Sequence, residues 1–403
     1  MTMRRTALLA SVALAIAALA PPTAAQAPAR AVQLAQDALI VDTHIDAPYA
    51  LRERWDDLGV SSDKEFDYPK ARAGGLDVAF MSIYTSPQQD ADGSARAVAH
   101  AQIDAVEALA ARHPDKFALL RSPRDVARHR GDGRVLLALG MENGAPLGDD
   151  LAQLAVFHAR GVRYVTLAHS KNNRLADSSY ALEKQWDGLS PLGERAVREM
   201  NRLGMMVDVS HLSDDAVRDV LALSKAPVIA SHSGLRHFTP GFERNLSDEL
   251  ARAVAAKGGV LQLVFGSGFV NPQAAADTQA YFRAAAEFER ENAAAKAAGR
   301  PLRSEADFDQ AWDAAHPTPE TRIGAVLDQV DHAVKLMGID HVGIGSDFDG
   351  VGGKLPVELR TVADYPNLVA GLQARGYGDA DIGKILGGNL MRVWRAVEAG
   401  AAR

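Results

Sequence analysis

Short apolar runs and longer amphipathic segments alternate along most of the chain. Each apolar run precedes a polar loop and then a stretch with helical spacing of apolar residues, as in "PLGERAVREMNRLG" and "DDAVRDVLALS". The runs that fit strands are Leu39–Thr43, Leu76–Ile83, Val135–Leu139, Val162–Leu167, Met205–Val209, Pro227–Ala230, Val260–Val264 and His341–Ile344. This alternation predicts an α/β fold with a parallel sheet and crossover helices. Eight such units favour a (β/α)8 TIM-type barrel over a doubly wound sheet.

Two segments depart from the repeat. Gln273–Arg300 is rich in alanine and strongly favours a helix, and it lies between the seventh and eighth predicted strands. We expect it to form a helical insertion on the loop face, as a lid or as an interface, and an interface is compatible with a homodimer. Thr85–Gly93 is rich in Pro, Gln, Asp and Gly, which predicts a loop after the second strand.

The N-terminus has the pattern of a secretory signal peptide. Arg4 and Arg5 precede the apolar run "ALLASVALAIAALA", and an Ala-x-Ala cleavage site ends at Ala27. We therefore expect a signal peptide over residues 1–27, a single barrel domain over 28–403, and export to the periplasm or the medium. The polar C-terminus "RVWRAVEAGAAR" predicts no membrane anchor.

Composition narrows the function classes further. The formal net charge is −7, and it becomes −9 without Arg4 and Arg5. Acidic and basic residues are interspersed without a basic stripe, so we expect no nucleic-acid partner. The sequence contains no cysteine, which excludes disulfides, thiolate nucleophiles and cysteine-ligated metals. A large hydrophobic core must therefore stabilise the domain.

Metal-competent or titratable side chains follow six of the predicted strands. In a barrel, the loops after the strands converge on one mouth, where active sites form. His44 and Asp46, in "VDTHIDAP", are two residues apart, so both point to the same side of an extended chain. The others are Glu142 in "LGMENG", His169 in "LAHSKNN", His211 in "VDVSHLS", His232 in "IASHSG" and Asp347 in "GSDFDG".

Each of these residues alone fits a helix cap, a turn or a hydrogen-bonded loop. Their joint placement instead predicts a metal centre, and nitrogen and oxygen donors without sulfur suit zinc or a similar divalent ion. Five ligands are too many for one open tetrahedral zinc, so we expect two ions. His44 and Asp46 would hold one ion, and His211 and His232 the other. Glu142 is the natural bridge between ions about 3.5–4 Å apart.

The motifs together resemble the membrane dipeptidase (renal dipeptidase) family of zinc peptidases, as an exported bacterial member. The segments that carry the resemblance are "DTHIDAP", "GMENG", "LAHSKNN", "NRLGMMVDVSHLS", "SHSG", "RNLSDE", "GIGSDFDG" and "GGNLMRVW". They run in family order from Asp42 to Trp394. The resemblance implies a (β/α)8 barrel with two zinc ions and the same ligand set, His44, Asp46, Glu142, His211 and His232.

The resemblance also implies roles for three further residues. Asp347 matches the general acid/base, and a protonated His169 matches the residue that stabilises the oxyanion and contacts substrate. Arg244, in "RNLSDE", matches a contact to the substrate carboxylate, a task that suits a guanidinium. The implied reaction is hydrolysis of free dipeptides, including L-Xaa-D-Xaa dipeptides, by a hydroxide that bridges the metals. Gly266 stands where animal members have a bulkier aromatic residue, so substrate contacts there remain open.

Two other functions are consistent with parts of the pattern. One is another binuclear amidohydrolase that acts on lactones, cyclic amides or phosphotriesters. Many of those enzymes bridge their metals with a carboxylated lysine after the fourth strand, where this chain has His169. The other is an exported binding protein on a degenerate barrel, which would require a ligand or Asp347 to be missing.

Overall fold

The computed structural model describes residues 27–401, so most of the expected signal peptide lies outside the described residues. The strands are β1 (Ile40–Ile45), β2 (Leu76–Tyr84), β3 (Phe117–Leu119), β4 (Val135–Glu142), β5 (Val162–Thr166), β6 (Met206–Asp208), β7 (Ile229–Ser233), β8 (Val260–Leu263) and β9 (Val342–Ile344). The eight predicted strands are all present, with ends that differ by at most three residues. Each hydrogen-bonded pair is parallel, in the order β1-β2-β4-β5-β6-β7-β8-β9.

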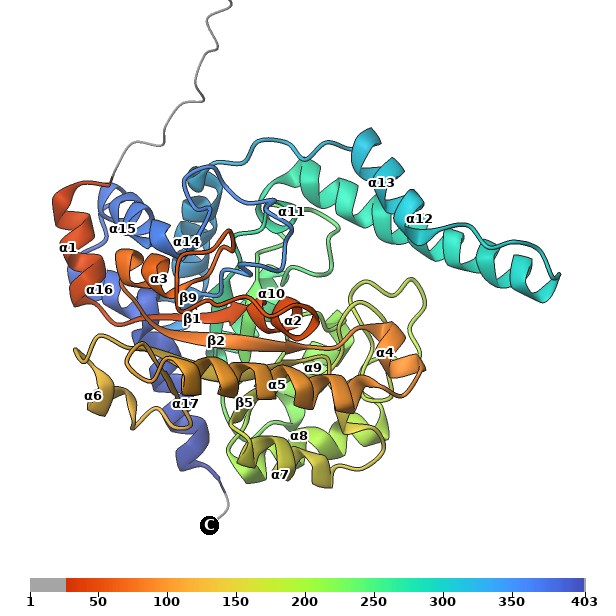
Figure 1. Ribbon diagram of the computed structural model, residues 1–403, viewed down its shortest axis with the longest axis horizontal. Coiled ribbons are helices and arrows are strands. Elements are labelled where there is room, and N and C mark those ends of the chain that lie inside the picture. Colours follow the sequence, from red (N-terminus) through yellow and green to blue (C-terminus); the bar gives the residue numbers. More distant parts are fainter. Residues whose placement is uncertain (1–26, 402–403) are drawn as a thin grey trace, which may run out of the picture.

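Helices alternate with the strands and surround the sheet (Figure 1). They are α1 (Ala29–Asp37), α2 (Ala47–Glu53), α3 (Tyr68–Gly74), α4 (Pro87–Ala91), α5 (Ala95–Arg112), α6 (Val126–His129), α7 (Ala152–Ala159), α8 (Pro191–Leu203), α9 (Asp214–Leu223), α10 (Asp248–Ala256), α11 (Ser267–Val270), α12 (Pro272–Ala297), α13 (Glu305–Ala315), α14 (Ile323–Met337), α15 (Tyr365–Ala374), α16 (Asp379–Gly383) and α17 (Asn389–Ala399).

The sheet curls into a nearly closed barrel, which confirms the (β/α)8 prediction. β1 meets the segment that follows β9 through a bridge between Ile45 and Phe348. The Thr43 hydroxyl, from β1, donates to the carbonyls of Ser231 on β7 (2.5 Å) and Ile344 on β9 (3.1 Å). Contacts across the first and last strands therefore bring the ends of the sheet together.

Period-two alternation sorts the strand residues between the barrel interior and the outer helix layer. Val41, Phe80, Leu136 and Tyr164 belong to an interior cluster that also contains Trp394 of α17. Phe80 and Trp394 have ring centroids 5.2 Å apart, so α17 packs against this interior cluster. The same alternation points every second residue of β4 inward and ends at Glu142, which the strand delivers to the mouth.

Two sequence predictions about short elements are corrected. Thr85–Gly93 is not only a loop, because it contains α4. Ser86 accepts from the backbone N–H of Gln89 while the Gln89 side chain accepts from the N–H of Ser86, a capping box that nucleates this short helix. The hydrophobic pattern also did not predict β3, a three-residue strand that pairs with the first three residues of β4.

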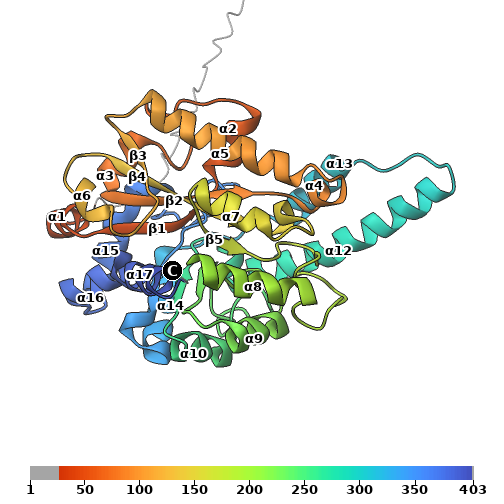
Figure 2. The ribbon, with the colours of Figure 1, turned by 90° about the horizontal axis from the view of Figure 1, so that it is seen from below.

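The predicted insertion between the seventh and eighth barrel strands, here β8 and β9, is helical. α12 extends beyond the barrel, and α13 lies along it (Figures 1 and 2). Tyr281 and Phe288 of α12 face Phe308 of α13, with ring centroids 5.9 and 4.7 Å apart. The two helices thus form a hairpin with its own aromatic contacts.

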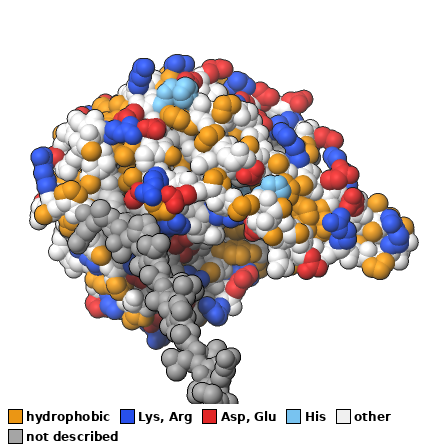
Figure 3. All heavy atoms as spheres, turned by 90° about the horizontal axis from the view of Figure 1, so that it is seen from above, with side chains coloured by type: hydrophobic (Ala, Val, Ile, Leu, Met, Phe, Trp, Pro, Cys, Tyr) orange, Lys and Arg blue, Asp and Glu red, His pale blue; other side chains and the backbone are white. Residues whose placement is uncertain are grey.

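Acidic and basic side chains are interspersed on the face of the molecule seen in Figure 3. Among residues 27–401, none of the helices combines the length and the apolarity that crossing a membrane requires.

Candidate metal centre

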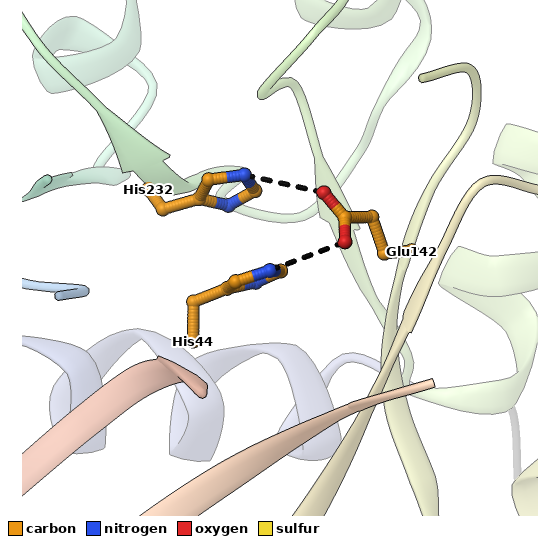
Figure 4. Close-up of side chains that lie close together, drawn as sticks. All are labelled: His44, Glu142 and His232. Atoms are coloured by element: carbon orange, nitrogen blue, oxygen red, sulfur yellow. Dashed lines mark ion pairs between the residues drawn. The ribbon is translucent and has the colours of Figure 1, made fainter. Parts of the chain in front are cut away.

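The five predicted ligands converge at one end of the barrel, although they come from four separate parts of the chain. His44 belongs to β1, Glu142 ends β4, and His232 belongs to β7. Figure 4 shows the imidazoles of His44 and His232 lying one above the other and facing the carboxylate of Glu142. All three side chains are buried, with 0–4 % of each residue exposed. Burial of so many polar groups in one place is costly unless a further group satisfies them.

One oxygen of Glu142 faces the first predicted ligand pair. His44 Nε2 lies 3.3 Å from Glu142 Oε2 and 3.4 Å from Asp46 Oδ2. Two ligands bonded to one tetrahedral zinc at about 2.0–2.1 Å lie about 3.3 Å apart. The spacing of these three atoms therefore fits ligands around one ion.

The other oxygen of Glu142 faces the second pair. Glu142 Oε1 lies 3.0 Å from His211 Nε2 and 3.3 Å from His232 Nε2. The two imidazole nitrogens are 2.8 Å apart, and both lie beside this oxygen. The two oxygens of one carboxylate thus face two separate donor sets, which is the arrangement that a bridging ligand requires.

A tyrosine fixes the tautomer of His44. The Tyr164 hydroxyl donates to the carbonyl of Thr43 (2.9 Å). Its oxygen can therefore only accept from His44 Nδ1, 2.9 Å away, which makes Nδ1 the protonated nitrogen. The lone pair of His44 Nε2 is left facing Asp46 and Glu142. Gly140 makes room for the ring, since a Cβ there would lie 1.9 Å from the Tyr164 Cζ.

A serine and an aspartate fix the tautomer of His232 in the same way. The Ser231 hydroxyl donates to Asp208 Oδ2 (2.6 Å), so its oxygen accepts from His232 Nδ1 (2.8 Å). Asp208 Oδ2 also accepts from Thr166 Oγ1, and its Oδ1 accepts from the backbone N–H groups of Ser210 and Ser231. With Nδ1 protonated, His232 Nε2 keeps its lone pair for a metal.

Asp42 supports the end of the first strand through backbone hydrogen bonds. Its Oδ1 accepts from the backbone N–H groups of His44 (3.0 Å) and Ser346 (2.9 Å), and its Oδ2 accepts from the Tyr365 hydroxyl. His44 lies on β1 and Ser346 follows β9, so Asp42 links these two segments at the mouth of the barrel.

The local electrostatics favour a cation. His44 Nε2 is buried and has no hydrogen-bond partner within the part of the chain that the structure describes. Burial alone would lower the pKa of His44, but Tyr164, Glu142 and Asp46 raise it well above its usual value. The negative surroundings that attract a proton there also attract a metal ion. Burial lowers the pKa of His211 well below its usual value, which keeps this imidazole in the neutral form that ligates metals.

Asp347 lies beside the first donor set, since His44, Asp46 and Asp347 place ligand-type atoms within 4.8 Å of one another. Burial and the charge of Asp46 raise the pKa of Asp347 well above its usual value, as is typical of groups that take up and release protons in active sites. Its backbone is left-handed (φ 67°), as is that of His211 (φ 67°). Such conformations are unfavourable for non-glycine residues and concentrate at functional sites.

His169 lies at the same mouth, with Nε2 3.4 Å from Glu142 Oε1. Burial lowers its pKa, which favours a neutral imidazole over the protonated form that the resemblance implies. Arg244 is 2 % exposed, and its guanidinium donates to Ser233 Oγ and to the carbonyl of His232, both at 2.7 Å. Its Nη2 also lies 3.0 Å from His211 Nε2, and its Nε is buried without a partner among residues 27–401.

Sequence reasoning did not identify Tyr164, Asp208 and Ser231 as supports of the site. A signal was present for Asp208, because a carboxylate ending the apolar run "MMVDVS" has to be satisfied inside the fold. Tyr164 gave no such signal, since its strand pattern fits a core aromatic residue equally well.

A third group of donors lies on other elements and does not have the geometry of a metal centre. His237, Asp248 and His332 come together, and His332 Nε2 lies 3.1 Å from each oxygen of Asp248. The two imidazoles are stacked, with an interplanar angle of 17°. The in-plane lone pairs of stacked rings run parallel and do not converge on one ion. We interpret the group as an ion pair at the start of α10 with a stacked histidine.

Comparison with known proteins agrees with this geometry. A family model described as membrane dipeptidase (peptidase family M19) matches residues 28–403. Dipeptidase tcpJ of Claviceps purpurea is 32% identical over 378 residues, which cover 90% of this chain and 77% of that protein.

Two solved structures are similar over most of their length. The probable dipeptidase PvdM from Pseudomonas aeruginosa has a TM-score of 0.78 and 31% identity, over 92% of this chain and 98% of that one. A metallopeptidase from Rhodobacter sphaeroides, liganded with a phosphinate mimic of the dipeptide L-Ala-D-Ala, has a TM-score of 0.72 and 25% identity, over 89% and 99%. The chain therefore belongs to the membrane dipeptidase family, M19, and is a metallopeptidase that hydrolyses peptide bonds.

Proposed function

We propose that this protein is a dinuclear zinc dipeptidase that cleaves free dipeptides, including L-Xaa-D-Xaa dipeptides. One observation carries the proposal: the two oxygens of Glu142 face two separate donor sets. Oε2 lies beside His44 and Asp46, and Oε1 lies beside His211 and His232, at distances of 3.0–3.4 Å between ligand atoms. An all nitrogen-and-oxygen donor set with one shared carboxylate suits two zinc ions.

Two zinc ions bound by these residues would polarise the scissile carbonyl and activate water at neutral pH. The protein must hold and move the protons. Asp347, whose pKa is raised by burial and by Asp46, would accept the proton of the attacking water and deliver it to the leaving amine. The neutral imidazole of His169 lies beside Glu142 Oε1 and would donate a hydrogen bond to the developing oxyanion.

Arg244 would contact the free carboxylate of the substrate. Ser233 and the His232 carbonyl orient its guanidinium, and its Nε has no partner among the described residues. A buried cation at this position would favour substrates that carry a carboxylate one residue after the scissile bond, which is a dipeptide. Tolerance of a D-residue is supported by the dipeptide mimic bound in the Rhodobacter sphaeroides relative.

A metal analysis and a substrate panel on one sample test the proposal. We expect close to two zinc equivalents per chain and hydrolysis of L-Ala-D-Ala, with little activity on lactones or phosphotriesters. Full dipeptidase activity in metal-free protein would contradict the metal mechanism. Arg244→Ala should raise KM for free dipeptides at least tenfold more than for C-terminally amidated ones, because only the former present the carboxylate.

We also propose that the chain is exported after cleavage near Ala27, on the basis of its N-terminal sequence pattern. N-terminal sequencing of protein recovered from the periplasm of an expression host tests this. An intact N-terminus on cytoplasmic protein would contradict it.

A further inference from the structure

One face of the projecting helix α12 contacts the barrel mouth, and a different face contacts α13. Thr278, Phe282 and Glu289 are spaced four and seven residues apart, so they lie on one stripe of the helix. Thr278 packs against Gly268 of α11, because its Oγ1 lies 3.0 Å from the position that a Cβ on Gly268 would occupy. At the far end of the stripe, Glu289 forms an ion pair at 2.7 Å with Lys171, from the loop after β5.

Phe282, in the middle of this stripe, stacks on Tyr180 of the loop after β5. The ring centroids are 3.9 Å apart, with an interplanar angle of 28°. Tyr180 in turn lies 5.9 Å from the His211 ring and 6.0 Å from the Phe242 ring. The backbone N–H of Ser179 donates to the carbonyl of His211 (2.8 Å), which ties this loop to the second donor set.

The aromatic cluster surrounds Arg244. The guanidinium carbon of Arg244 lies 5.0 Å from the centroid of the Phe269 ring, and Phe269 lies 6.1 Å from Phe242. Arg244 also lies beside the Tyr180 phenol. Burial raises the pKa of Tyr180 to about 12, so this phenol is neutral across the working pH range. The wall around the cation is therefore apolar and uncharged on the α12 side.

We propose that the Tyr180–Phe282 stack is a specificity-determining wall that receives the side chain of the substrate's C-terminal residue. The inference rests on the proposed dipeptidase function, in which Arg244 binds the substrate carboxylate. A residue whose carboxylate is held at Arg244 has its side chain beside Tyr180, and Phe282 stacks on that ring. Apolar C-terminal side chains are then favoured over glycine, because they bury surface against two aromatic rings.

The test compares kcat/KM for L-Ala-Gly and L-Ala-D-Leu. Phe282→Ala should lower kcat/KM for L-Ala-D-Leu about tenfold, the effect of losing an apolar contact, and should change L-Ala-Gly less than about twofold. Alanine favours helix, so α12 is retained, and circular dichroism checks this. Arg283→Ala is the matched control, because Arg283 is the next residue on α12 and is exposed. It should leave the ratio of the two substrates unchanged.

The outcomes separate this inference from the proposed function. Wild-type protein that cleaves neither dipeptide contradicts the function itself. Wild-type protein that cleaves both, with a Leu/Gly ratio that Phe282→Ala does not change, overturns only the proposed wall. Equal losses of kcat/KM for both substrates also overturn it. Such losses indicate general damage to the site and not the loss of one side-chain contact. Binding of non-hydrolysable phosphinate dipeptide mimics with Gly or D-Leu side chains, measured by calorimetry, should show the same ratio.

Discussion

Replacing Asp208 by asparagine should remove one metal ion without touching a ligand. Asp208 Oδ1 accepts from two backbone N–H groups, so the amide oxygen of asparagine has to take that position. The amide NH2 then lies where Oδ2 accepted the hydroxyl of Ser231. It donates to the Ser231 oxygen, and the Ser231 hydroxyl turns to donate to His232 Nδ1. This selects the tautomer with a proton on Nε2, the nitrogen that faces Glu142.

The expected loss in zinc affinity at the His211/His232 set is about 10- to 100-fold, the usual effect of removing the partner of a ligating histidine. Losing the two hydroxyl bonds to a charged acceptor should also lower the free energy of unfolding by about 1–3 kcal/mol. Zinc content after dialysis against a competing chelator should fall from about two equivalents to about one. The ¹⁵N chemical shifts of His232 should report the exchanged tautomer.

Asp42→Asn is the matched control for this experiment. Asp42 is also fully buried and also accepts from the backbone N–H two residues later. Its other oxygen accepts from Tyr365, so no ligating imidazole depends on it. Asp42→Asn should therefore cost stability but keep both zinc ions. Two tightly held equivalents in Asp208→Asn, or equal zinc loss in the two variants, would refute the tautomer argument.

Three further predictions concern the same end of the barrel. Gly350→Ala should abolish activity and weaken metal binding, because its Cβ would lie 2.2 Å from Asp46 Oδ2 and 2.4 Å from Asp347 Oδ1. The control is Gly383→Ala, whose Cβ would meet no other part of the described chain within 4 Å, so it should match wild type in zinc content and kcat. Asp347→Asn should keep its zinc but lose about 10²- to 10⁴-fold in kcat, and normal turnover would assign the proton transfer to another residue. Burial raises the pKa of Glu65 from 4.5 to about 7, so the native state binds more protons than the unfolded chain between these values. Stability should therefore fall as pH rises through that window, and urea unfolding of Glu65→Gln should show a flatter dependence on pH.

The sequence by itself determined the barrel and the identity of the donors. Eight apolar runs separated by amphipathic segments specify eight parallel strands, because burial of each run is a local property of hydrophobic spacing. The position of each donor directly after such a run was equally local, so His44, Asp46, Glu142, His211 and His232 could be selected before the fold was known. Two short elements, β3 and α4, were not predicted from the sequence, because three to five residues carry little periodicity.

Only the tertiary structure decided how these donors face one another. The two oxygens of Glu142 face different donor sets because the curvature of the sheet places the end of β4 opposite the ends of β1, β6 and β7. The supports of the site depend on the same closure: Tyr164 meets His44 across 120 positions of the chain. The docking of Phe282 on Tyr180 also joins segments far apart in sequence. Such contacts arise from the packing of the whole barrel, and a local pattern carries no information about which distant residue will complete them.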